Sequence, residues 1–286
     1  MDGLVFWTHR VMRQGCRERV HLEQLEEMWC EFRDFAPKGF RRKFQVEFHQ
    51  RWWEMYLTLG LLHLGVNIKT SPADEGPDLC VDINGKRLWI EAVAPRVGTT
   101  SDRVPEPTVN GVSDYPKREC LLRLSQQLNA KRNIFEKYIQ KAIIQPEDVC
   151  IIAISACNLN QYGSLLDFPC SAPLALLAGA GDMVVTRNSS QDTYFKQQKT
   201  INRDSGSPID FMMYERDDFK IVSGILYSNN DPLNAPSRPE STFSLFLNPR
   251  AYYHVPCDIY MKMETWTEEK RKVETIWKKL VRALEP

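Results

Sequence analysis

The sequence predicts a mixed α/β fold, in which helices flank a central sheet, from three features of its first half. Residues 76–95 predict two short strands joined by Asn84-Gly85, because both central residues of a type I′ hairpin turn need positive φ. Residues 149–155 form the continuous apolar run typical of a strand buried on both faces. Amphipathic segments at 43–64 and 118–142 predict the flanking helices.

The composition is that of an ordinary globular protein. The 286 residues are enough for one large domain, and 37 basic and 37 acidic residues give a formal net charge of zero. Without net positive charge, binding to nucleic acid needs a local basic patch. The eight cysteines include no C-x-x-C pair, and the most apolar stretch, residues 172–185, is too short to span a bilayer. We therefore expect a soluble, cytoplasmic protein without a membrane partner.

The first 69 residues predict two helices and a strand. Residues 20–35 have apolar side chains at the three- and four-residue spacing of a helix. The helix at 43–64 is apolar almost all round in its second half, so we expect it to be buried. Glu54 lies in that half, an awkward place for an unpaired acid, and Glu47 shares its helix face. A short strand is expected at 66–69.

The predicted hairpin sets two acids against each other. Counting outward from Asn84-Gly85 pairs Leu79 with Ile90 and places Asp78 opposite Glu91. Two facing carboxylates repel, so a sheet keeps them when a cation lies between them or when one is protonated. Hard divalent cations such as Mg²⁺ take carboxylate oxygens, so the pair indicates a metal site. A one-residue slip of the register, or fraying at the strand end, would remove this site.

The same register gives the hairpin two different faces. The opposite face should bring Asp82 and Arg87 together as a cross-strand ion pair. The apolar face should carry Leu79, Val81, Ile83, Leu88 and Ile90.

A long loop and a helix follow the hairpin. Residues 96–117 are rich in Pro, Gly, Ser, Thr and Asp, and a loop of this length is often a lid or a binding loop. In the helix at 118–142, Lys131 falls on the apolar stripe that contains Leu128 and Phe135. Its ammonium group therefore either reaches out to solvent or has an anionic partner inside.

The pattern beyond residue 156 is less regular. Lys196, Lys199 and Arg203 form a basic run, which indicates either phosphate contacts or a solvated surface. An amphipathic helix is expected at 265–284. Strands are expected at 183–186, 209–214, 219–228 and 241–247.

The order of helix, strand, hairpin, helix and strand, with acids on the first helix and on the paired strands, resembles the PD-(D/E)XK nuclease superfamily. The signature of that superfamily is Pro-Asp at the start of one strand and Glu-x-Lys on the next. Here Pro77-Asp78 supplies the first half and Glu91 the second acid, whereas Val93 stands where the family has lysine. In some branches the lysine lies on the following helix, where Lys131 is the matching residue.

The resemblance implies a restriction-endonuclease-like core, αβββαβ, over residues 40–156. Residues 1–39 would form an N-terminal helical segment, and residues 157–286 an α+β extension of the same domain.

The resemblance also implies a metal site and its chemistry. Asp78 and Glu91 would hold Mg²⁺, or Mn²⁺, together with the carbonyl oxygen of Ala92, and Glu54 would bind through a water or a second ion. Lys131 would orient the attacking water or neutralise charge on the phosphate.

The implied activity is hydrolysis of phosphodiester bonds, with DNA as the expected substrate, in defence against foreign DNA or in repair. Arg123, Arg96, Lys196 and Lys199 are the weaker candidates for contacts with nucleic acid. Nuclease-like folds often act as dimers, so that both strands are cut. A homodimer is therefore one expected assembly of this protein.

Two alternatives remain at this point. The missing motif lysine and the zero net charge favour an inactive nuclease-fold protein that binds nucleic acid or protein. A weaker alternative is a cysteine nucleophile, Cys80 or Cys157 with His49 or His254, although their spacing gives no support.

Overall fold

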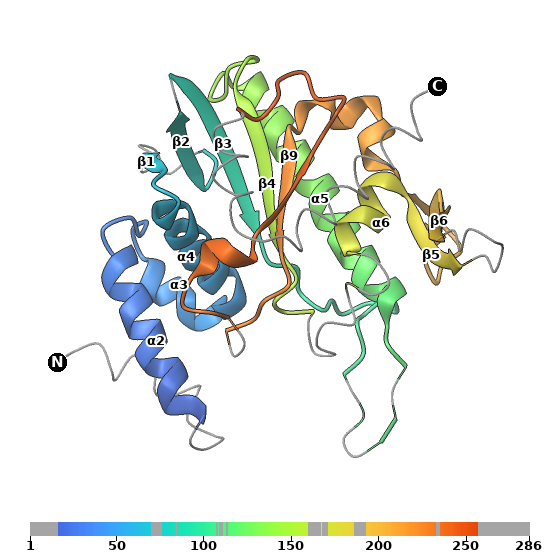
Figure 1. Ribbon diagram of the computed structural model, residues 1–286, viewed down its shortest axis with the longest axis horizontal. Coiled ribbons are helices and arrows are strands. Elements are labelled where there is room, and N and C mark those ends of the chain that lie inside the picture. Colours follow the sequence, from blue (N-terminus) through green and yellow to red (C-terminus); the bar gives the residue numbers. More distant parts are fainter. Residues whose placement is uncertain are drawn as a thin grey trace.

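The computed structural model describes residues 17–69, 76–83, 85–106, 108, 111–112, 114–159, 167, 171–185, 193–232 and 235–256. Within these residues the chain forms a six-stranded mixed sheet with helices on both sides, which confirms the expected mixed α/β class (Figure 1). In spatial order the strands are β1 (Asn67–Lys69), β2 (Leu79–Ile83), β3 (Lys86–Val93), β4 (Val149–Ser155), β9 (Gly224–Ser228) and β10 (Ser244–Leu247).

The pairing of neighbouring strands changes twice across the sheet, from antiparallel to parallel and back. β1, β2 and β3 are antiparallel neighbours, whereas β3, β4 and β9 run parallel, and β10 is again antiparallel to β9. Helix α5 (Lys117–Gln140) lies in the connection from β3 to β4, as a parallel pair requires a long crossover. The C-terminal strands β9 and β10 thus continue the sheet that the first 156 residues begin.

The hairpin of β2 and β3 has the register that the sequence predicts. Gly85 adopts φ +78°, which favours glycine, and Asn84 lies outside the described residues. The paired residues are Leu79 and Ile90, Cys80 and Trp89, Val81 and Leu88, Asp82 and Arg87, and Ile83 and Lys86.

The expected ion pair between Asp82 and Arg87 is wrong, although the two residues are register partners. Lys69 Nζ on β1 donates to Asp82 Oδ2 at 2.8 Å. Arg87 Nε donates instead to Asp148 Oδ1, just before β4, at 3.1 Å. Both partners come from the strands that flank the hairpin, which a hairpin considered alone does not include.

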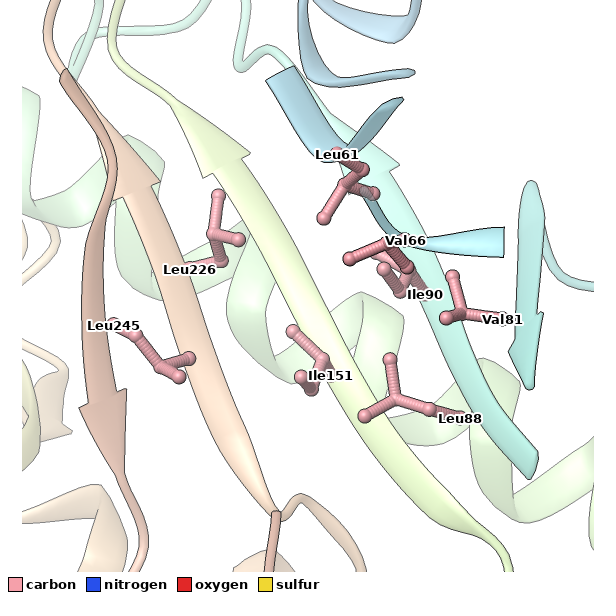
Figure 2. Close-up of a pocket in the computed structure, with 8 residues that line it drawn as sticks. All are labelled: Leu61, Val66, Val81, Leu88, Ile90, Ile151, Leu226 and Leu245. Atoms are coloured by element: carbon pink, nitrogen blue, oxygen red, sulfur yellow. The ribbon is translucent and has the colours of Figure 1, made fainter. Parts of the chain in front are cut away.

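The two faces of the sheet pack against different helices. Helices α2 (Arg17–Phe32), α3 (Phe40–Val46) and α4 (Phe48–His63) cover one face, and α5 and α6 (Ala172–Ala178) contribute to the core on the other (Figure 1). The predicted apolar face of the hairpin lies against α4 and is confirmed. Figure 2 shows eight apolar side chains of this layer around a gap of about 10 Å³, too small and too apolar to hold a ligand.

Helix α4 is anchored in this core. Trp53 and Tyr56 are fully buried, and Trp53 Nε1 donates to the Ala153 carbonyl of β4 at 3.0 Å. A Cβ atom on Gly60 would meet the Phe243 ring at 2.3 Å, so only glycine lets the segment before β10 approach so closely. The expected burial of this helix is therefore confirmed.

The single helix expected at 43–64 is in fact two, α3 and α4, separated at Glu47. Glu47 has φ −124° and ψ 46°, outside the helical region, while its N–H still bonds to the Lys43 carbonyl. No proline or glycine marks the break. It accompanies edge-on packing of Phe44 against Phe48, a tertiary contact that helix periodicity does not reveal.

The remaining expectations are met in part. The expected helix at 20–35 corresponds to α2, that at 118–142 to α5, and the short strand at 66–69 to β1. The helix expected at 265–284 lies outside the described residues, and α6 was not predicted. Among the described helices none is long and apolar enough to cross a membrane.

The C-terminal strands are shorter than expected, because 3₁₀ turns take part of three predicted ranges. These turns are η2 (Met213–Glu215), η3 (Asp217–Ile221) and η4 (Pro239–Thr242). Two small antiparallel hairpins stand apart from the main sheet and comprise β5 (Ala180–Val185) with β6 (Thr193–Gln197), and β7 (Thr200–Asn202) with β8 (Pro208–Asp210).

Candidate active site

One open cleft brings together α4, the start of β2, the segment after β3, and α5. Its volume is about 420 Å³, and charged and amide side chains make up most of its lining. Five of the predicted site residues line it, namely Glu54, Asp78, Arg96, Arg123 and Lys131. Glu91 is buried and is not among the lining residues.

Lys131 contacts both acids of the hairpin. Its Nζ donates a hydrogen bond to Glu91 Oε2 and lies 3.7 Å from Asp78 Oδ2. Continuing the β2–β3 register by one residue sets Asp78 against Glu91. The side chain of Lys131 is 16% exposed and that of Glu91 only 4%, so the pair lies largely out of water. The inward-facing lysine therefore has an anionic partner, and it neither reaches out to solvent nor pairs with Glu54.

Glu54 is instead paired by Arg51, which sequence analysis missed. Arg51 Nη1 donates to the two carboxylate oxygens of Glu54 at 2.8 and 2.6 Å. Its Nε and Nη2 donate to Glu47 Oε2 at 3.1 and 2.7 Å. Glu47 and Glu54 do share a helix face, and the arginine lies between them. The spacing of Arg51 from the two acids could have predicted these contacts, because residues three and four positions apart on a helix are neighbours.

The surroundings of Glu54 and Glu91 disfavour the charged form of both carboxyl groups. Burial, and then the charge of Asp78, raise the pKa of Glu54 to about 7 against the opposing effect of Arg51. The same two causes raise the pKa of Glu91 to about 7 against the opposing effect of Lys131. Both carboxyls thus lie in a place where their charged form is too little compensated.

Gln50 is a second site residue to which sequence analysis gave no role. Its Nε2 donates to Glu54 Oε1 at 2.9 Å and to the Ala92 carbonyl at 3.1 Å. Its Oε1 accepts the N–H of Ala94 at 2.8 Å. The two backbone partners are 42 and 44 positions further along the chain, so no local pattern reports these contacts.

Arg123 is held beside the loop that follows β3. Its guanidinium donates to Thr100 Oγ1 at 3.2 Å and to Gln126 Oε1 at 3.4 Å, while its buried Nε has no hydrogen-bond partner among the described residues. A Cβ atom on Gly98, where φ is +88°, would lie 2.3 Å from the Arg123 Cζ atom. Arg96 is more open, with its side chain 76% exposed and its Nη2 3.9 Å from Glu47 Oε1. Two arginines therefore flank the acids.

The structure does not bring Lys196 and Lys199 to this cleft. Lys196 lies on β6 and Lys199 in the turn after it, and both are exposed and absent from the lining. Their contribution to any contact with nucleic acid would be made outside the cleft.

Cys80 and Cys157, the two candidate cysteines, do not have the surroundings of nucleophiles. Burial raises the pKa of the Cys157 thiol to about 12 and also raises that of Cys80, whereas a reactive thiol needs a lowered pKa. Cys157 Sγ contacts the backbone carbonyl of His49, at 3.9 Å, and His254 is exposed. The cysteine mechanism is not supported.

The donor set fits a divalent cation, although lysine and arginine now hold the acids. Among the described residues no three His, Cys, Asp or Glu side chains are gathered closely enough to form a ready-made metal centre. The carboxylate oxygens of Asp78, Glu91 and Glu54 are nevertheless the ligands that Mg²⁺ and Mn²⁺ take. Their mutual repulsion is also the kind that an added cation relieves.

Comparison of this chain with protein-family models, with curated proteins and with solved structures gives no match.

Proposed function

We propose that this protein is a Mg²⁺-dependent phosphodiesterase that cleaves DNA, with a restriction-endonuclease-like core. The observation that carries the proposal is the ammonium of Lys131, which contacts Glu91 and Asp78 beside an open cleft that Glu54 also lines. Acids of raised pKa around a partly buried lysine are typical of active sites rather than of surface ion pairs.

Asp78 and Glu91 would hold the cation, with the Ala92 carbonyl, and Glu54 would bind through water or a second ion. When bound, the cation supplies a Lewis acid that polarises a phosphoryl oxygen and lowers the pKa of a water. Mn²⁺ has the same preference for oxygen ligands and would substitute.

The side chains of this chain do the rest of the work. Lys131 holds a positive charge where the phosphate would enter, and it can orient the attacking water or stabilise negative charge as it develops. Arg123 and Arg96 flank the acids and would bind neighbouring phosphates. Among its described lining residues the cleft has no aromatic side chain to stack on a base, which favours contacts with the backbone and little reading of sequence.

The runner-up is a nuclease-fold protein that binds nucleic acid or protein without cleavage. The observation in its favour is Val93, which stands where the Glu-x-Lys motif has lysine. The buried pair of Glu91 and Lys131 opposes it, because a site that binds no cation would lose little or gain stability if apolar side chains of similar volume replaced both residues.

The test is cleavage of single- and double-stranded DNA with Mg²⁺, Mn²⁺ or EDTA by the parent and by Asp78→Ala, Glu91→Ala and Lys131→Ala. We expect metal-dependent cutting that all three variants lose by at least about 100-fold. Asp82→Ala is the matched control, because it removes an acid of the same hairpin whose partner is Lys69, and it should cut normally. Metal binding without cutting of either substrate would favour the binding module, and cutting that survives EDTA would refute the metal mechanism.

A further inference from the structure

Strand β3 extends beyond the strand that covers one of its edges. The ladder between β2 and β3 ends at Leu79 and Ile90, whereas the ladder between β3 and β4 continues to Val93 and Ile154. Within the described part of the chain, backbone groups of Ala92 and the following residues thus have no strand beside them on the β2 side. Buried backbone N–H and C=O groups need partners, so something else must supply them.

Two side chains supply these partners. Asp78 Oδ2 accepts the N–H of Ala92 at 2.8 Å. Gln50, on α4, takes the next two groups, because it donates to the Ala92 carbonyl at 3.1 Å and accepts from the Ala94 N–H at 2.8 Å. The amide of Gln50 therefore does for β3 what another residue of β2 would do in a longer hairpin.

The side-chain amide of Gln50 uses both of its N–H groups and its oxygen in hydrogen bonds. One N–H goes to the Ala92 carbonyl, the other goes to Glu54 Oε1 at 2.9 Å, and the oxygen takes the Ala94 N–H. Turning the amide round would set oxygen against two acceptors and nitrogen against a donor, so only one orientation satisfies all three contacts. Gln50 is thereby a rigid link between helix α4 and the end of β3.

Both acceptors of the Gln50 amide are ligands in the proposed metal site, and this inference rests on that proposed function. We propose that Gln50 is a positioning residue, which sets the directions of the Ala92 carbonyl and the Glu54 carboxylate toward the cation. A carbonyl oxygen has two lone pairs, so a hydrogen bond from Gln50 leaves one for the metal. Groups that orient metal ligands in this way typically change affinity or activity by about 10–100-fold when removed.

The test is Mn²⁺ affinity, measured by calorimetry on the metal-free protein at pH 8. Gln50→Met keeps the length of the side chain and removes all three hydrogen bonds. We expect its Mn²⁺ affinity to fall by about 10–100-fold. Gln24→Met is the matched control, because Gln24 donates to the backbone carbonyl of Ala235 at 3.1 Å, away from the cleft. It should lose stability while its Mn²⁺ affinity stays within about twofold of the parent.

A purely structural role for Gln50 would lower the thermal midpoint of Gln50→Met and leave Mn²⁺ affinity unchanged, and that result would overturn the inference. Tighter binding would also overturn it, because Gln50 would then compete with the cation for the carbonyl. Failure of the parent itself to bind Mn²⁺ would instead refute the proposed function. The two failures are therefore distinguishable.

A measurement without any variant guards against misfolding of Gln50→Met. In the parent, substoichiometric Mn²⁺ should broaden the side-chain amide signals of Gln50 in a ¹⁵N spectrum and leave those of Gln24 sharp. Gln50 signals that stay sharp while Mn²⁺ is bound would place the ion elsewhere and reject the positioning role.

Discussion

Lys131 on α5 donates a hydrogen bond to Glu91 on β3, and this contact joins the crossover helix to the central hairpin at the inner end of the cleft. Burial opposes the charge of Lys131, but Glu91 and Asp78 outweigh that effect and raise the pKa of the lysine. The ammonium is therefore the cation that holds the hairpin acids in the metal-free protein. A divalent cation that binds the same acids has to compete with it.

Replacing Lys131 by methionine should separate metal binding from catalysis. The change removes a positive charge that competes for Asp78 and Glu91, so Mn²⁺ should bind several-fold more tightly. Cleavage should fall by about 100-fold or more, because the charge facing the phosphate is lost. Calorimetry and a DNA-cleavage assay measure the two effects on the same preparation.

Lys137→Met is the control for this prediction, because Lys137 is an exposed lysine of the same helix. It should change neither Mn²⁺ affinity nor cleavage. Weaker binding of Mn²⁺ by Lys131→Met would show that the lysine supports the cation rather than competing with it.

Asp78→Asn should make the stability of the metal-free protein depend less on pH between 4.5 and 8. Burial and then Asp78 raise the pKa of Glu54 and Glu91 to about 7. A glutamate whose folded pKa exceeds its unfolded value of 4.5 binds more protons when folded, so its charge destabilises the fold as pH rises from about 4.5 to 7. Without the repelling charge, the free energy of unfolding should fall by about 1 kcal/mol less between pH 4.5 and pH 8 than it does in the parent, whereas the lost attraction to Lys131 lowers stability at both pH values.

Urea denaturation in EDTA at the two pH values measures this difference. Asn can still accept the Ala92 N–H, so the fold should be kept. The increase in thermal midpoint that Mg²⁺ gives the parent should disappear in the variant. Asp82→Asn, in the strand that follows Asp78, should leave the pH dependence of the parent unchanged, and an equal change there would mean that general surface charge, not the site, is responsible.

The part of the site that the sequence predicts is the part that local rules determine. The Asn84-Gly85 turn and the alternation around it place Asp78 opposite Glu91, because register follows from counting along two adjacent strands. Lys131 could be identified as a candidate because a charged side chain on an apolar helix stripe either reaches solvent or has a buried partner. The pairing of Asp78 with Glu91 lies within one hairpin and the stripe of Lys131 within one helix, whereas the contact of Lys131 with Glu91 depends on how α5 packs on the sheet.

The missed residues depend on how α4 lies against β3. Gln50 meets Ala92 and Ala94 only because α4 packs across the end of that strand, and no spacing along the chain encodes this placement. The wrong pairing of Arg87 has the same origin, since Asp148 comes from the segment before β4. The break at Glu47 likewise coincides with a ring contact between Phe44 and Phe48, and no proline or glycine signals it.

Gly98→Ala should weaken DNA binding as Arg123→Ala does. The new Cβ atom would lie 2.3 Å from the Arg123 Cζ atom, so the guanidinium has to leave its place in the cleft. Gly39→Ala is a matched control, because Gly39 also has positive φ, +77°, but no atom of the described residues lies within 4 Å of its Cβ position. Both variants should lose about 1 kcal/mol from backbone strain, and only Gly98→Ala should bind DNA less tightly in a fluorescence-anisotropy titration.

His63 should make stability depend on pH through a contact outside the cleft. Its Nε2 lies 3.1 Å from Glu31 Oε2 on α2, and its Nδ1 lies 3.1 Å from Glu240 Oε2 in η4, a carboxyl that Arg238 also contacts. Neutral imidazole has a single N–H, so only the protonated ring donates to both carboxylates. Burial disfavours the charge of His63, yet the two acids outweigh that effect and raise its pKa above 6.5.

Because the folded pKa of His63 is raised, its stabilising effect is complete below about pH 6.5 and is lost as pH rises through the folded value. His63→Gln can bond to both carboxylates but carries no charge, so it should lose on the order of 1 kcal/mol at pH 6. At pH 9 the parent has lost the same contribution, and the two proteins should then unfold at nearly equal urea concentrations. A stability difference that is the same at pH 6 and pH 9 would mean that shape, not charge, makes His63 hold α2 and η4 to α4.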